Sequence, residues 1–231
     1  MAESRLLYYI TNRAAFAADE PTRRRRLLEK IFEAARAGVD YIQLREKDLP
    51  TRELESLARE AINTIRQARE LAADSRQPAT ALLINSRADV AMAIGAEGVH
   101  LRSLDISPRE VATIWKKSAL GVGGETRPGT TAPLTPLIAV SCHSPEEVIE
   151  AAAHGATLAV FAPVFEKKTA SPAGLGALSK ACQANIPVLA LGGVTLSNAR
   201  SCLDAGAAGI AAIRLFQEGD IAAIVETLRQ G

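Results

Sequence analysis

The sequence predicts an α/β fold, a single (β/α)8 TIM barrel that spans residues 1–231. Short apolar runs alternate with amphipathic helical segments eight times. No linker interrupts this alternation, which favours one closed barrel of repeated β/α units. A turn containing adjacent glycine and alanine also recurs before the apolar runs, at residues 37–42, 95–99, 155–159 and 206–210. An open, doubly wound sheet is the alternative, although it usually has fewer units in a chain of this size.

The predicted strands are short apolar runs bounded by glycine, proline or a polar residue. In chain order they are Leu6–Thr11, Tyr41–Leu44, Ala81–Asn85, Gly98–Leu101, Leu137–Ser141, Leu158–Phe161, Pro187–Leu191 and Gly209–Ile213. The spacing between them leaves room for one helix after each strand.

Helical patterns fill these intervals. They cover Thr22–Ala37, Thr51–Ala73, Arg87–Ile94, Pro108–Trp115, Pro145–His154, Leu175–Gln183, Asn198–Ala205 and Ile221–Leu228. Ser107-Pro108 and Ser144-Pro145 place a capping hydroxyl before a proline at the first helical position. The Gly-, Pro- and Thr-rich segment 121–136 precedes a strand, so we expect a surface loop on the face opposite the catalytic loops.

Composition excludes several classes of function. The chain has 27 Lys and Arg against 26 Asp and Glu, and only 4% aromatic residues, which argues against a nucleic-acid partner. No apolar run approaches the ~18 residues that a membrane helix needs, so no membrane partner is expected. Three widely spaced cysteines and an N-terminus without a signal-peptide pattern predict a cytoplasmic protein. The sequence leaves a homo-oligomer open.

The end of the second strand carries the most specific functional signal. Because side chains alternate along a strand, Gln43, Arg45 and Lys47 share one face, while Ile42 and Leu44 share the other. The apolar pair must face the helices, so the polar three rise along the lumen toward the mouth. Two cations and an amide there suit a phosphate or pyrophosphate. The alternative is a structural ion pair with a neighbouring carboxylate.

Polar residues also end the third, fourth and fifth strands. Asn85 is a candidate substrate ligand or, alternatively, a cap for the next helix. Asp105 is a candidate Mg²⁺ ligand or a turn residue. Ser141 and His143 share a face, and His143 is a candidate proton-transfer group or a packed or capping histidine.

The last two strands predict a second anion site. Gly192 and Gly193 follow the seventh strand, and Ile213 and Arg214 end the eighth. Paired glycines beside loop eight match the usual phosphate site of such barrels, where backbone N–H groups approach the ligand closely. A tight turn without a ligand is the alternative. Two anion subsites at one mouth suit an enzyme that handles two phosphorylated small molecules.

Several stretches of the sequence resemble the thiamine phosphate synthases and their relatives, the thiazole tautomerases. They are residues 41–47 (YIQLREK), 83–91 (LINSRADVA), 95–101 (GAEGVHL), 140–147 (VSCHSPEE), 162–165 (APVF) and 191–194 (LGGV). The similarity runs in order from about Leu7 to about Phe216. The Gln-x-Arg-x-Lys strand is its most specific part.

The resemblance implies an enzyme that joins hydroxymethylpyrimidine pyrophosphate to hydroxyethylthiazole phosphate, releasing pyrophosphate, with Mg²⁺ as cofactor. It places Gln43, Arg45 and Lys47 at the pyrophosphate and Asp105 at the metal. On the same basis the remaining contacts are Asn85 and Ser141 for the pyrimidine, Thr169 and Gly193 for the thiazole phosphate, and Lys167 or Lys168 in place of a missing loop cation.

The sequence departs from the synthase pattern at four positions. Ser86 replaces a metal-binding Asp, Lys167 and Ala170 replace the first Thr and the final Lys of a Thr-x-Thr-Lys motif, and Arg214 replaces a Ser. The tautomerase branch also lacks that Asp and uses a histidine corresponding to His143, so an isomerase is one alternative. A non-catalytic barrel that only binds a thiazole or thiamine phosphate is another. The retained Gln43, Arg45, Lys47 and Asp105 favour the synthase, a transferase.

Overall fold

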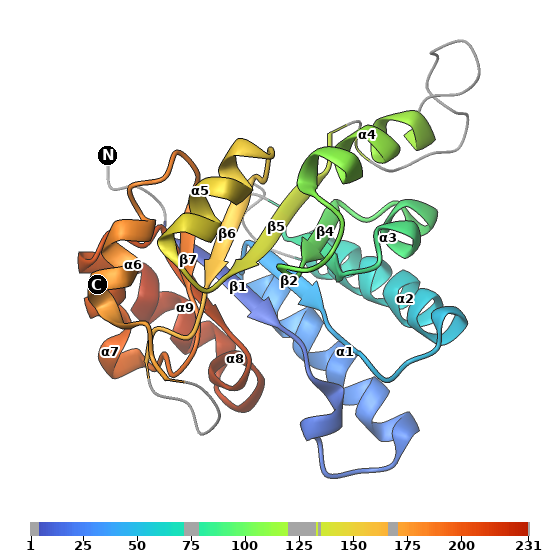
Figure 1. Cartoon of the computed structure of the whole chain (residues 1–231). Coiled ribbons are helices and arrows are strands. Elements are labelled where there is room, and N and C mark those ends of the chain that lie inside the picture. Colours follow the sequence, from blue (N-terminus) through green and yellow to red (C-terminus); the bar gives the residue numbers. More distant parts are fainter. Residues whose placement is uncertain (1–4, 72–78, 120–132, 134, 166–170, 231) are drawn as a thin grey trace.

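The protein is a closed barrel of parallel strands enclosed by helices (Figure 1). The computed structural model describes residues 5–71, 79–119, 133, 135–165 and 171–230. Its strands are β1 (Leu6–Ile10), β2 (Tyr41–Leu44), β3 (Ala81–Asn85), β4 (Gly98–Leu101), β5 (Leu137–Cys142), β6 (Leu158–Phe161), β7 (Val188–Ala190) and β8 (Gly209–Ala212). β1 pairs with β2 on one side, Tyr9 opposite Ile42, and with β8 on the other, Tyr9 opposite Ala212. The predicted barrel is therefore confirmed and the open sheet is wrong.

The helices follow the predicted order. They are α1 (Glu20–Ala37), α2 (Thr51–Glu70), α3 (Ala88–Ile94), α4 (Pro108–Ala119), α5 (Pro145–Ala153), α6 (Gly174–Ala181), α7 (Leu196–Asp204), α8 (Arg214–Glu218) and α9 (Ile221–Gln230). The predicted caps are present, since Ser107 Oγ accepts from the N–H of Glu110 and Ser144 Oγ from that of Glu147. Two short elements were not predicted: α8 and the 3₁₀ turn Arg13–Ala15. Both are too short to show a helical period in sequence.

Alternating side chains build two apolar layers. One fills the barrel lumen and includes Tyr8, Leu83, Ala139, Val160 and Leu189. The other lies between strands and helices and includes Tyr9, Ile42 and Leu44, as the alternation in the second strand predicted. Strand residues of the same phase therefore point into the lumen, and those past the strand ends reach the carboxyl-terminal mouth.

Two of the recurrent glycines are explained by close strand contact. A Cβ on Gly98 would lie 1.9 Å from the Leu137 carbonyl oxygen, and a Cβ on Gly209 would lie 1.9 Å from that of Leu6. Only glycine fits where β4 and β8 start beside their neighbours. In the described part of the chain, no helix is long and apolar enough to cross a membrane. Most of the predicted loop 121–136 lies outside the described residues.

Candidate active site

The three polar residues predicted at the end of β2 differ in exposure, since Arg45 is half-buried and Lys47 is exposed in the turn that follows the strand. Gln43 is buried, and its Nε2 donates to Asn85 Oδ1 on β3 at 2.8 Å. Asn85 Nδ2 in turn donates to Ser86 Oγ at 3.2 Å. Asn85 thus belongs to the mouth and does not cap α3, whose N-cap residue is Arg87. Gln43 Oε1 is buried with no hydrogen-bond partner among the described residues, so it is an acceptor open to a ligand donor.

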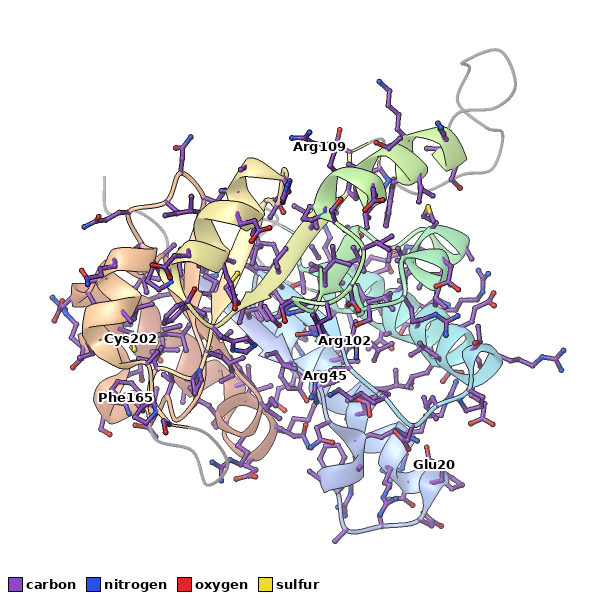
Figure 2. The ribbon with its side chains drawn as sticks, viewed as in Figure 1. Glu20, Arg45, Arg102, Arg109, Phe165 and Cys202 are labelled. Atoms are coloured by element: carbon purple, nitrogen blue, oxygen red, sulfur yellow. The ribbon has the colours of Figure 1, made fainter. Side chains whose placement is uncertain are left out.

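Arg45 and Lys47 form a site of concentrated positive charge with Arg102, which follows β4. Figure 2 shows Arg45 and Arg102 together near the centre of the barrel mouth, away from Arg109 on α4. The charge of Arg45, followed by partial burial and the charge of Arg102, lowers the pKa of Lys47. Burial also lowers the pKa of Arg45, against a smaller opposite effect of Glu46. Mutually repelling cations of this kind favour an anionic ligand.

The carboxylate nearest in sequence does not neutralise this site. Glu46 points to the other face of β2, where it accepts from Thr11 Oγ1 and from the backbone N–H and the guanidinium of Arg13. Arg13 is itself buried and also pairs with Asp48 at 2.8 Å. Among the described residues, neither Arg45 nor Lys47 has a carboxylate within ion-pair distance. Within the described part of the chain, the structural ion pair expected as the alternative at Arg45 and Lys47 lies instead at Arg13, which sequence reasoning missed.

Asp105 lies in the loop after β4 beside the same cations. Its carboxylate accepts from the backbone N–H of Arg102 at 2.8 Å and pairs with the Arg102 guanidinium at 2.8 Å, and its side chain is 11% exposed. Burial raises the pKa of Asp105, but hydrogen bonds from Arg102 and from the Ser86 hydroxyl outweigh it and lower the pKa overall. Asp105 is thus an ionised carboxylate at the mouth as well as the predicted turn residue. Ser86 is its neighbour and has a left-handed backbone, with φ of 58°.

A buried histidine that sequence reasoning missed lies between two of these strands. His100 on β4 bonds through Nδ1 to the Tyr8 hydroxyl and through Nε2 to Ser141 Oγ on β5, at 2.7 Å in each case. Burial, and then the Arg45 charge, lowers the pKa of His100 to about 3, against an opposite effect of Asp105. The signal was present in the alternation Val99-His100-Leu101, which places a polar ring at a lumen position.

The predicted second anion site is a cavity of about 310 Å³ at the ends of β7 and β8. Gly192, Gly193, Ile213 and Arg214 line it, together with Asn12, which was not predicted. Gly192 and Gly193 have φ of 97° and 68°, and a Cβ on Gly192 would lie 2.8 Å from Pro163 Cα. This backbone requires glycine and leaves amide groups accessible to a small anion.

His143 is exposed at the mouth and is neither packed nor a cap. Ser144 caps α5, whereas His143 Nδ1 donates to the Ala162 carbonyl oxygen at 2.6 Å. Since a carbonyl only accepts, His143 Nδ1 is the donor in this contact, and Nε2 has no hydrogen-bond partner among the described residues. Three further candidates, Lys167, Lys168 and Thr169, lie outside the described residues.

Comparison with known proteins identifies the family to which this barrel belongs. The sequence pattern of the family described as thiamine monophosphate synthase matches residues 7–128 and 130–216. The chain belongs to the thiamine monophosphate synthase family. One relative is the thiamine-phosphate synthase of Methanoculleus marisnigri. It is 37% identical to this chain over 202 residues, which cover 85% of this chain and 83% of the relative. The thiamine-phosphate synthase of Roseiflexus castenholzii is 33% identical over 213 residues, 90% of this chain and 79% of the relative.

A solved structure from the same family has the same fold. Thiamine phosphate pyrophosphorylase from Pyrococcus furiosus superposes with a TM-score of 0.74 at 28% identity, covering 99% of this chain and 95% of the other. The family resemblance seen in the sequence and the barrel architecture are both confirmed by these comparisons.

Proposed function

We propose that this member of the thiamine monophosphate synthase family couples hydroxymethylpyrimidine pyrophosphate with hydroxyethylthiazole phosphate, giving thiamine phosphate and pyrophosphate. The observation that carries the proposal is that a pair of cationic side chains and a glycine-lined cavity lie at one barrel mouth, where each suits an anion. One consists of Arg45 and Lys47 after β2, and the other is the Gly192–Gly193 cavity after β7. Only β1 separates β2 from β8 around the barrel, so two phosphorylated substrates can lie side by side.

The two sites divide the chemistry between them. The bond from the pyrimidine methylene carbon to the pyrophosphate oxygen breaks, and its electron pair leaves with the pyrophosphate. The thiazole nitrogen lone pair then forms the new C–N bond to that carbon. Arg45 and Lys47 stabilise the negative charge that develops on the leaving group. The backbone at Gly193 holds the thiazole phosphate, while Asn85 and Ser141 orient the pyrimidine.

The donor set at the mouth suits Mg²⁺ as the proposed cofactor. Asp105 is an ionised, largely buried carboxylate beside the pyrophosphate site. Mg²⁺ is commonly held by one or two carboxylates together with substrate phosphate oxygens and water, so one protein carboxylate suffices. No cluster of three acidic, histidine or cysteine ligands occurs among the described residues. Asp105 would hold the cation, which would supply further charge neutralisation for the leaving group.

A direct assay tests the proposal. Purified protein is supplied with both substrates and Mg²⁺, and, separately, with the carboxylated thiazole tautomer alone. We expect thiamine phosphate and pyrophosphate in equal amounts, and no product after a chelator is added. Turnover of the thiazole tautomer that survives the chelator and is lost in His143→Ala would contradict the proposal and establish a tautomerase.

Ser86 offers a gain-of-function variant for the same assay. Its hydroxyl bonds to Asp105, so Ser86→Asp places a second carboxylate beside the first. We expect Ser86→Asp to lower the Mg²⁺ concentration needed for half-maximal rate, with Ser86→Asn as the isosteric, uncharged control. Equal Mg²⁺ dependence in the two variants would argue against Asp105 as a metal ligand.

A further inference from the structure

A continuous chain of hydrogen bonds crosses the barrel lumen and ends at the mouth. It begins at the Tyr8 hydroxyl on β1, passes through both ring nitrogens of His100 on β4, and ends at Ser141 Oγ on β5. Tyr8 is fully buried and His100 is 2% exposed. The Tyr8 and His100 rings also make an edge contact, with centroids 5.8 Å apart. The reaction proposed above uses only the last member of this chain.

The direction of the two hydrogen bonds that join Tyr8, His100 and Ser141 follows from the number of donors and acceptors that these groups have. The His100 ring is neutral, as its low pKa requires, so one ring nitrogen donates and the other accepts. Among the described residues, the Tyr8 hydroxyl has His100 Nδ1 as its only hydrogen-bond partner. If Nδ1 were the donor, the buried Tyr8 proton would be left without an acceptor. The Tyr8 O–H therefore donates to Nδ1, and His100 Nε2–H donates to Ser141 Oγ.

This direction determines what Ser141 can offer a ligand. Its oxygen already accepts from His100, and its own proton has no acceptor among the described residues. We propose that Tyr8 and His100 are positioning residues that hold Ser141 as a hydrogen-bond donor to an acceptor atom of the pyrimidine substrate. The proposal rests on the substrate assigned under the proposed function. If the two hydrogen bonds ran in the opposite direction, the Ser141 hydroxyl would donate to His100 and could not donate to the acceptor atom of the substrate.

The tautomer of His100 provides a test that needs no turnover. ¹⁵N NMR of the unliganded protein distinguishes protonated from bare ring nitrogens. The chain has 3 histidines, so His143→Gln and His154→Gln spectra assign the His100 signals by elimination. We expect His100 to remain neutral with the proton on Nε2 throughout the pH range in which the protein is folded. A ring protonated on Nδ1 would overturn the inference.

Binding measurements link the tautomer to the ligand, and the adjacent residue supplies a matched control. Tyr8→Phe removes the lumen hydroxyl, whereas Tyr9→Phe removes an equally buried hydroxyl on the other face of β1, where it bonds to Gln217. Losing one aligned hydrogen bond should weaken binding of hydroxymethylpyrimidine pyrophosphate by roughly 2- to 10-fold in Tyr8→Phe. We expect no change in Tyr9→Phe, and no change for hydroxyethylthiazole phosphate in either variant.

A double substitution distinguishes an effect of Tyr8 on Ser141 from an effect of Tyr8 on the packing of the barrel lumen. In the Ser141→Ala background, Tyr8→Phe should have no further effect on pyrimidine pyrophosphate binding, because Ser141 is the only route by which Tyr8 acts. Additive losses would overturn the inference. Absence of pyrimidine pyrophosphate binding by the unmodified protein would instead overturn the proposed function, so the two failures are distinguishable.

Discussion

Replacing Arg45 with methionine should weaken pyrophosphate binding without weakening the fold. Arg45 is half-buried at the mouth, has no carboxylate partner among the described residues, and lies close enough to Lys47 to lower the pKa of that lysine. In the free protein its charge is thus repelled and incompletely solvated. Methionine keeps most of the side-chain volume and removes the charge, so the free energy of unfolding should stay within about 0.5 kcal/mol or rise.

The same substitution should weaken the binding of hydroxymethylpyrimidine pyrophosphate. A charge-assisted contact to a phosphate oxygen contributes ~1.5–3 kcal/mol, so the Kd for hydroxymethylpyrimidine pyrophosphate should rise roughly 10- to 150-fold in Arg45→Met. The Kd for hydroxyethylthiazole phosphate should change little, because that ligand is assigned to the Gly192–Gly193 cavity. Isothermal titration calorimetry with each ligand, alongside urea unfolding, measures both quantities. Arg109→Met, an exposed arginine on α4 whose guanidinium bonds to the Ala153 carbonyl, is the matched control.

Two results would refute this reasoning. Equal weakening of both ligands would mean that Arg45 does not belong to a separate pyrophosphate site. A large loss of unfolding free energy in Arg45→Met would mean that the charge has a structural partner that the described residues do not show.

Four other changes have distinct expected outcomes. Glu46→Gln should lower the unfolding free energy by ~1.5–3 kcal/mol in urea unfolding, because it breaks charge-assisted bonds to the buried Arg13, yet leave pyrophosphate binding intact. Gly192→Ala should lower the free energy of unfolding by about 1–3 kcal/mol and weaken thiazole phosphate binding, because φ is 97° and the new Cβ would contact Pro163. Its control is Gly176→Ala on α6, where a Cβ meets no neighbouring atom and should not destabilise the protein. Asp105→Asn should make the free energy of unfolding fall less as the pH decreases below about pH 4. The pKa of Asp105 is lowered in the folded protein, so its stabilising effect is present above the unfolded pKa and is lost as the pH falls through the folded pKa. His143→Ala should leave thiamine phosphate formation nearly unchanged, and its abolition in a discontinuous product assay would show that the ring takes part in the coupling.

The residues at the end of β2 show how much a local sequence pattern can predict. Alternation within a single strand predicts Gln43 on the lumen face and Ile42 and Leu44 against the helices, and the structure has these three residues there. The hydrogen-bond and ion-pair partners of the charged side chains could not be predicted from this alternation. Glu46 is adjacent to both cations in sequence, yet it bonds to Thr11 and Arg13 across β1. Those contacts depend on strand pairing, which brings together residues more than 30 positions apart.

Sequence pattern alone predicts the barrel, the order of its elements and the faces on which Gln43, Ile42 and Leu44 lie. These properties depend on period-two and helical repeats, caps and glycine turns, which are short-range. The three-dimensional structure was needed to show that His100 joins Tyr8 and Ser141, that Asn12 lines the Gly192–Gly193 cavity and that Asn85 bonds to Gln43 instead of capping a helix. Closure of β1 onto β8 and the shared lumen set these contacts. They arise from distances between strands far apart in the chain, which no local periodicity encodes.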